Sequence, residues 1–180
     1  MTVRSSAVRR GLAGLLAVSA LAAGGCSAQS GAAAVVEGRA ISVADVHAAT
    51  DELRPFLQDA TPASILVVLI AEPTFRRAAA AAGVGVSQQE ARSLLEQLAS
   101  DAPGAAPQFG DASLAVARFT LLQQGLRELP DAQEVLAGIS EELTELDVDV
   151  NPRFGELDFA AGGITPVVHP WIVQDEAAAP

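Results

Sequence analysis

Four oxygen-bearing residues near the end of the chain have a spacing that could bind calcium. Asp147, Asp149 and Asn151 alternate along the sequence, and Asp158 lies eleven positions after the first of them. Carboxylate and amide oxygens at such spacings approximate the calcium loop of an EF-hand. However, Pro152 occupies the position where that loop needs glycine for its sharp turn. The intervening valines instead indicate a strand whose acidic side chains face water, so we expect no metal site.

The other candidates for chemistry do not form a catalytic set. The two histidines, His47 and His169, lie far apart, and neither has a partner at metal-binding spacing. The chain has no Gly-x-Ser-x-Gly nucleophile motif, and because it lacks lysine it has no phosphate-binding loop of the P-loop kind. Acidic pairs such as Glu141 and Glu142 are typical of a solvated helix face. The sequence therefore predicts no enzyme, no catalytic residue, no cofactor and no small-molecule substrate.

The only cysteine predicts a site of lipid attachment. Three arginines within residues 1–10 precede an apolar run over 11–23, which is the order of a secretory signal and is shorter than the roughly 20 residues that span a bilayer. The segment from Leu21 to Cys26 resembles a bacterial lipobox, with Ala23 where leucine is more usual. We expect a lipoprotein signal peptide over 1–25, acylation of Cys26, and anchoring to the extracytoplasmic face of the cell membrane.

Two alternatives remain open at this end of the chain. An ordinary signal peptide, cut among the small residues 22–25, would leave Cys26 as a free thiol in an oxidising compartment, where it would invite intermolecular disulfides. Acylation would consume this thiol and so prevent such disulfides, and we therefore favour it over an ordinary signal peptide. The pair Arg9-Arg10 is compatible with twin-arginine export as well as with the general secretory route.

The chain after the signal segment is strongly acidic. From Cys26 onward it keeps all 22 acidic residues but only eight arginines, for a formal charge of −14. Such a surface repels nucleic-acid phosphates and anionic lipid headgroups. We therefore expect no nucleic-acid partner, and we expect membrane contact to come from the acyl chains alone. The length suffices for one buried core without disulfides or metal.

The hydrophobic periodicity predicts a mainly α-helical domain over residues 34–159. A flexible tether is expected at 26–33 and a C-terminal tail at 160–180. Within the domain, a strand or tight hairpin is expected over 34–41, because short apolar pieces flank a Glu-Gly turn signal. After Leu146 the period changes to two, which predicts a second, half-buried strand.

Helices are expected between these strands, with five recognisable starts, and residues 74–82 are expected to form a separate or a kinked helix after Pro73. Pro55 and Pro73 are expected to bend or end helices, and the segment 102–110 is expected to be a loop because of its glycines and prolines. The residues expected at the helix starts are Ser42 with Asp45, Thr61 with Pro62, Ser87 with Glu90, Asp111, and Asp131 with Glu134.

Aromatic residues gather late in the chain, where Trp171 follows Pro170 and lies downstream of Phe154 and Phe159. They could form an aromatic wall for apolar peptides. The interpretation that we favour is that the tail folds back and pins itself to the domain with these rings.

Two segments resemble the N-terminal domain of the SurA family of chaperones, whose elements also occur in PrsA-like foldases and trigger factor. The first opens the predicted domain at 34–46, and the second is Val-Gly-Val-Ser-Gln-Gln-Glu at 84–90. The ending at 148–155, with Pro170-Trp171 behind it, sharpens the resemblance to SurA-N-terminal-like lipoproteins of high-GC Gram-positive bacteria. The resemblance implies that a strand within 35–40 pairs with one within 148–153 and closes a helical cradle. Because only 25 residues follow Gly155, a parvulin-type isomerase domain is not expected.

The resemblance implies a membrane-tethered, non-catalytic holdase that binds unfolded, newly exported polypeptides in apolar grooves between helices. Tethering would raise its local concentration near emerging chains. The alternative is a structural or regulatory lipoprotein of the cell envelope that binds one specific folded partner. A holdase predicts a broad concave apolar surface, whereas a dedicated partner site predicts a smaller patch with a polar rim.

Overall fold

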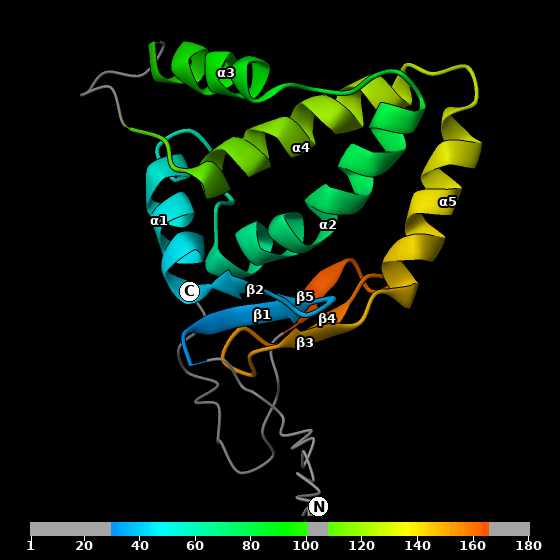
Figure 1. Cartoon of the computed structure of the whole chain (residues 1–180). Helices are drawn as coiled ribbons and strands as arrows, with labels where there is room; N and C mark the ends of the chain where they lie inside the picture. Colours follow the sequence, from blue (N-terminus) through cyan, green and yellow to red (C-terminus); the bar gives the residue numbers. More distant parts are fainter. Residues whose placement is uncertain (1–29, 101–107, 166–180) are drawn as a thin grey trace, which may run out of the picture.

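The computed structural model describes residues 30–100 and 108–165, and it confirms a mainly α-helical fold in these residues. Figure 1 shows the helices gathered on one side of a small three-stranded sheet, with a short second hairpin beside that sheet. In chain order, the elements are β1 (Ala32–Val36), β2 (Arg39–Ser42), α1 (Val43–Leu53), α2 (Pro62–Ala81), α3 (Gln88–Ser100), α4 (Asp111–Arg127), α5 (Ala132–Glu145), β3 (Val148–Val150), β4 (Glu156–Asp158) and β5 (Gly163–Thr165).

The three-stranded sheet joins the two ends of the domain. Strands β1 and β2 form a hairpin whose turn residues, Glu37 and Gly38, both have positive φ angles, at 49° and 76°. Strand β3 pairs antiparallel with the other edge of β1, with Val35 opposite Asp149. The expected pairing of the first and last segments is therefore confirmed. The sheet has three strands instead of two because the opening segment folds back on itself.

The domain extends beyond its expected limits at both ends. Strand β1 begins at Ala32, within the segment expected to be a tether. Strand β5, within the expected tail, pairs antiparallel with β4, with Ile164 opposite Leu157. The turn between these two strands is held by Asp158, whose Oδ1 accepts hydrogen bonds from the backbone N–H groups of Ala160 and Ala161 at 2.8 and 3.0 Å. A period-two pattern is too short in these three-residue strands to reveal them.

Three of the expected helix starts are confirmed by side-chain caps. The Ser42 hydroxyl accepts a hydrogen bond from the Asp45 N–H at 3.0 Å, and the Thr61 hydroxyl accepts one from the Ser64 N–H at 3.1 Å. At the third start, the Ser87 hydroxyl accepts from the Glu90 N–H at 3.2 Å, and the Glu90 carboxylate accepts from the Ser87 N–H at 2.8 Å. These reciprocal bonds satisfy N–H groups that have no partner within the helix.

The other two starts differ from expectation. Helix α4 is capped by Gly110, so Asp111 is its first helical residue instead of its cap. Asp131 does precede α5, but its side chain makes no capping hydrogen bond, because its φ and ψ angles of −105° and 24° depart from the extended geometry of a cap. A sequence pattern places a cap only within a residue or two.

Helix α2 continues through Pro73 from Pro62 to Ala81, so no separate helix begins after this proline; of the two outcomes expected there, a break or a bend, the break does not occur. Proline inside a helix costs a hydrogen bond and crowds the preceding turn. Burial on both sides offsets this cost: Ile70 and Ala71 precede the proline in the core, and Phe75 and Ala79 follow it. By contrast, α1 ends before Pro55, as expected.

The core consists of two apolar clusters, and α2 and α4 contribute to both. The first lies beneath the three-stranded sheet and includes Val46, Leu53, Leu66, Ile70 and Leu114. The second lies where α5 packs against α2 and α4, as expected for the last two helices, and it includes Phe75, Leu122, Leu126, Ile139 and Leu143. Between the two clusters, α2 and α4 carry charged side chains in place of apolar ones.

Candidate functional site

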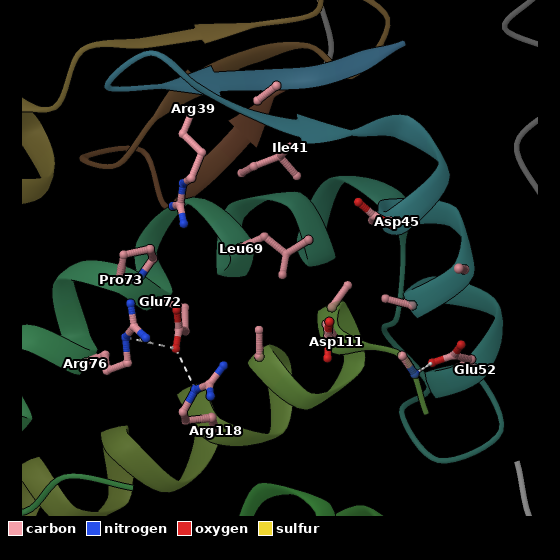
Figure 2. A pocket seen from close by; sticks show the side chains of 16 residues that line it. Arg39, Ile41, Asp45, Glu52, Leu69, Glu72, Pro73, Arg76, Asp111 and Arg118 are labelled. Atoms are coloured by element: carbon pink, nitrogen blue, oxygen red, sulfur yellow. Dashed lines mark hydrogen bonds and ion pairs between the residues drawn. The ribbon is translucent and has the colours of Figure 1, made fainter. Parts of the chain in front are cut away.

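A pocket of about 440 Å³ lies among β2, α1, α2 and α4 and is open to solvent. Figure 2 shows its two sides, with arginines around Glu72 on one side and acidic residues on the other. Small or apolar side chains lie between them. Its lining is Arg39, Ala40, Ile41, Asp45, Ala48, Ala49, Glu52, Leu69, Glu72, Pro73, Arg76, Gly110, Asp111, Ala112, Ala115 and Arg118.

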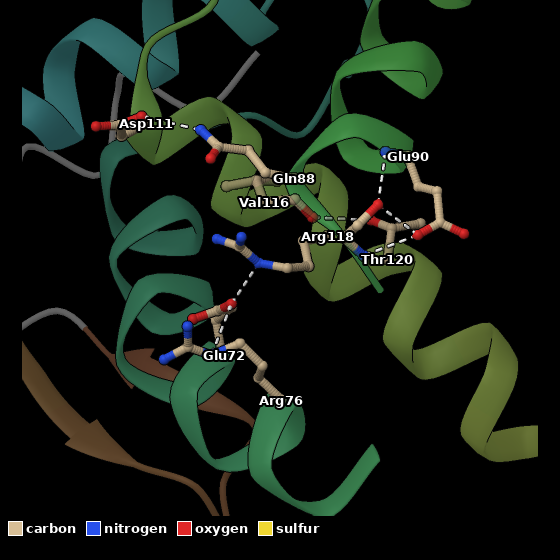
Figure 3. A network of polar contacts seen from close by, with 9 residues as sticks. Glu72, Arg76, Gln88, Glu90, Asp111, Val116, Arg118 and Thr120 are labelled. Carbon is tan, nitrogen blue, oxygen red and sulfur yellow. Dashed lines mark hydrogen bonds and ion pairs between the residues drawn. The ribbon is translucent and has the colours of Figure 1, made fainter. Parts of the chain in front are cut away.

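The cationic side of the pocket is organised by a nearly buried carboxylate. The Glu72 side chain on α2 is 7% exposed, and its Oε1 accepts a hydrogen bond from Arg118 Nε on α4 at 2.7 Å. Arg76, one turn later on α2, places its Nε 3.8 Å from the same oxygen. Figure 3 shows both contacts, and Figure 2 shows that Arg39 reaches toward this group from β2. Two guanidinium groups therefore contact one carboxylate, and a third lies on the same side of the pocket.

Arg118 keeps hydrogen-bonding capacity after its contact with Glu72. Its side chain is only 17% exposed. A guanidinium has five N–H donors, and among the described residues Arg118 donates only from Nε. Within the same residues, no side-chain nitrogen or oxygen is buried without a partner. The terminal nitrogens of Arg118 therefore reach open space, where they can donate to a ligand.

The acidic side of the pocket comes from α1 and the start of α4. Glu52 Oε2 accepts hydrogen bonds from the Gly110 N–H, at 2.9 Å, and from the Ser113 hydroxyl, and so holds the start of α4 against α1. Asp111 Oδ1 accepts a long hydrogen bond, of 3.5 Å, from Gln88 Nε2. The Asp45 carboxylate makes no hydrogen bond or ion pair with any residue that the structure describes. Asp45 and Asp111 thus have carboxylate oxygens available to a cationic group.

The floor between the two sides contains a break in the helix hydrogen bonds. Proline has no N–H, so the bond that would run from position 73 to the carbonyl of Leu69 cannot form. Leu69 and Pro73 both line the pocket, with the small side chains of Ala49 and Ala115 nearby. The arrangement offers donors on one side and acceptors on the other.

The residues considered as calcium ligands form ordinary structural contacts. The Asn151 Nδ2 group donates to the Ala32 carbonyl at 3.0 Å, Asp149 lies in β3, and Asp158 holds the turn between β4 and β5. Over residues 30–100 and 108–165, no three His, Cys, Asp or Glu side chains gather as a metal site. The structure confirms the strand that the sequence predicts here, at β3.

The remaining sequence-based candidates lie apart from the pocket. His47 and Phe154 have ring centroids 6.4 Å apart and line a second opening of about 530 Å³ beside Val43 and Pro62. Phe159 packs against the core, and the loop expected at 102–110 is described only at 108–110. The signal peptide, Cys26, His169, Pro170 and Trp171 lie outside the described residues.

The sequence analysis missed the charged pocket. One signal could have revealed it: Arg118 lies four positions after Leu114 and four before Leu122, both of which are fully buried. Glu72 similarly follows the apolar run of 65–71 directly. A charge at the helical spacing of buried residues predicts a buried ion pair. Its partner could not be named from the sequence alone.

Two surface features bear on the choice between the expected functions. In the described part of the chain, the only large apolar side chain that is exposed is Leu57, at 40%. A shallow groove of about 510 Å³ runs between α3 and α4, with half-buried Val86, Leu94 and Leu121 along it and glutamines and glutamates at its rim. No helix among the described residues is both long and apolar enough to cross a membrane.

No family model, no curated protein and no solved structure matches this chain.

Proposed function

We propose that this chain is a lipid-anchored, non-catalytic binding protein of the cell envelope that recognises one specific partner through charge complementarity. The observation that carries the proposal is the charge-divided pocket, in which Arg76 and Arg118 lie on one side and Asp45 and Asp111 on the other. Charge pairs arranged in a fixed geometry discriminate among partners more than they add affinity. This property suits a dedicated binding protein better than a general one.

The cost of the pocket supports a role in binding. Taking charges out of water costs several kcal/mol per ion, and a buried ion pair rarely stabilises a fold more than apolar residues of the same size would. One arginine, Arg118, neutralises Glu72, and the exposed Arg39 and Arg76 add positive charge at the same side of the pocket. This positive charge supports recognition of an anionic group.

The proposed location is the outer face of the cell membrane, through acyl chains on Cys26. This part of the proposal rests on the lipobox-like segment and on the signal-like order of the residues before it. The described domain begins only a few residues after Cys26, at β1, the central strand of the three-stranded sheet. Acylation would therefore hold the domain close to the membrane surface.

A second candidate function is the holdase implied by the resemblance to the SurA family. The groove between α3 and α4 favours it, because its half-buried Val86, Leu94 and Leu121 could contact an extended apolar segment. Against it, a holdase that binds many unfolded chains needs a broad apolar surface, and the described residues expose only Leu57 among their large apolar side chains. We therefore place this function second.

Photocrosslinking in cells separates the two functions. A photoreactive residue would replace Ala112 in the pocket in one strain and Gln97 in the groove in another. The proposed function predicts one discrete adduct from position 112, which is lost when Arg76→Gln is added, and little from position 97. A smear of many adducts from position 97, unaffected by Arg76→Gln, would establish the holdase and reject the pocket as the binding site.

The anchor has its own test. Mass spectrometry of the N-terminus of the protein from membranes should find an acylated Cys26 as the first residue. An unmodified thiol, or a different first residue, would reject the proposed location while leaving the pocket experiment valid.

A further inference from the structure

We infer that the pocket between α1, α2 and α4 binds a small zwitterion, a short peptide with free ends, whose carboxylate pairs with Arg76 and Arg118 and whose ammonium group pairs with Asp45 and Asp111. The inference deepens the proposed function and rests on its assignment of the pocket as the binding site. It names the chemistry of the ligand, which the proposed function leaves open.

The arginine side of the pocket specifies an anionic group of limited size. Glu72 holds Arg118 by its Nε, so the terminal nitrogens of Arg118 keep a fixed direction toward the open space. Arginine is suited to a carboxylate, because two parallel N–H groups match its two oxygens. With Arg39 and Arg76 nearby, this side carries two positive charges more than Glu72 neutralises.

The opposite side excludes a ligand that is only anionic. Asp45, Glu52 and Asp111 place three carboxylates in the same pocket, and from Cys26 onward the chain carries a formal charge of −14. A ligand with negative charge at both ends would be repelled there. Glu52 accepts two hydrogen bonds through its Oε2, whereas Asp111 accepts only one long contact and the Asp45 carboxylate none from the described residues, so Asp45 and Asp111 are the more available acceptors for an ammonium group.

The space between the two sides fits a short peptide. Small side chains such as Ala49 and Ala115 leave room for the backbone and for short side chains. The volume, about 440 Å³, falls within the usual range of small-molecule sites, roughly 300 to 1,000 Å³.

The test uses the full-length acylated protein in detergent micelles. The probe is an equimolar mixture of dipeptides and tripeptides with free ends, compared with the same mixture acetylated at the N-terminus, amidated at the C-terminus, or both. Binding is followed by the rise in Tm and by titration calorimetry. We expect the free-ended mixture to raise the Tm. Acetylating the N-terminus or amidating the C-terminus should each weaken binding at least about tenfold, which is the effect of losing one charge-assisted hydrogen bond.

Pocket variants locate the binding. Arg76→Gln and Asp45→Asn should each weaken binding of the free-ended peptides at least about tenfold. Both changes are at accessible side chains and should leave the circular dichroism spectrum unchanged. Arg54→Gln is the matched control: Arg54 is also exposed, but it pairs with Asp51 at 3.5 Å and does not line the pocket, so it should bind as the unmodified protein does.

Three results would overturn the inference. The first is no rise in Tm with free-ended peptides, and the second is equal binding of free-ended and doubly capped peptides. The third is a rise with inorganic phosphate that matches that of the peptides, with no effect of acetylating the N-terminus, which would make the pocket a site for anions only. If peptides fail while the crosslink from position 112 still depends on Arg76, the inference falls and the proposed function stands. If both fail, the pocket is not the binding site.

Discussion

The Glu72 carboxylate accepts a hydrogen bond from Arg118 Nε at 2.7 Å and thereby links α2 to α4 between the two apolar clusters of the core. Both side chains are largely withdrawn from water, at 7% and 17% exposure. The pair therefore does two things: it joins the two central helices, and it holds Arg118 in a fixed orientation at the edge of the pocket.

The substitution Arg118→Met should destabilise the fold strongly, because it leaves the carboxylate of Glu72 buried with only the more distant Arg76 beside it. Removing one partner of a buried pair costs about 3–5 kcal/mol. The double change Glu72→Leu with Arg118→Met should recover most of that loss, since it replaces both charges with apolar groups. Urea denaturation of the three proteins measures these differences.

The control for this experiment is Arg77→Met. Arg77 pairs with Glu142 at the surface, where both side chains are about half exposed. An exposed pair contributes no more than about 1 kcal/mol, so this variant should lose little. Equal losses for Arg77→Met and Arg118→Met would show that the Glu72 pair is not a buried one.

Pro73→Ala should stabilise the protein by up to about 3 kcal/mol, the cost of proline inside a helix. The new N–H at position 73 would complete the helical hydrogen bond to the Leu69 carbonyl. Pro62→Ala is the control, because Pro62 is in the first turn of the same helix, where no N–H partner is needed, and it should be nearly neutral. A loss of stability on Pro73→Ala would mean that the proline ring is itself tightly packed.

Gly155→Ala should disrupt the hairpin of β4 and β5. Gly155 has a φ angle of 119°, and a Cβ atom there would collide with the carbonyl of Thr165. A residue held in such a conformation costs about 1–3 kcal/mol before the collision is counted. Hydrogen exchange should show faster exchange of the β4 and β5 amides in this variant.

The matched change Gly138→Ala should act in the opposite direction. Gly138 lies in the interior of α5, and nothing lies within 4 Å of the place that its Cβ would take. Replacing glycine by alanine in a helix stabilises by about 0.5–1 kcal/mol. If Gly155→Ala proves as harmless as Gly138→Ala, Gly155 does not lie as close to the backbone of β5 as described.

The start of α3 should depend on pH. The hydroxyl and the backbone N–H of Ser87 donate to the Glu90 carboxylate, and these bonds lower the pKa of Glu90 below its ordinary value. Because the folded state has the lower pKa, this cap contributes its stability above the ordinary glutamate pKa of about 4.3. The contribution is lost as the pH falls below that value and through the lowered pKa.

Hydrogen exchange of α3 in Glu90→Gln measures this dependence. The variant should exchange faster than the unmodified protein at neutral pH, and the difference should shrink as the pH falls through the lowered pKa of Glu90. Glu96→Gln, in the same helix and also exposed, should show no such convergence. If the difference in exchange rate between Glu90→Gln and the unmodified protein stayed constant with pH, the Glu90 carboxylate would not be capping α3.

Predictions that depend on neighbouring residues were the most successful. The caps at Ser42, Thr61 and Ser87 could be recognised because each joins residues only three positions apart. The sequence left open whether Pro73 ends or bends a helix, and the core packing of Ile70 and Phe75 on either side of it keeps α2 continuous. The strands β4 and β5 were missed, because they depend on pairing with each other and not on a pattern of their own.

The sequence by itself determined the helical content, the positions where most helices begin, and the strong acidity of the chain. These properties follow from side chains within one or two turns of each other and from simple counts. The tertiary structure decided where the charges meet. Glu72 and Arg118 lie 46 residues apart on different helices, and Arg39 comes from strand β2, so no local pattern brings them together. Only the packing of α2 against α4 excludes enough water to make their contact strong and their orientation fixed.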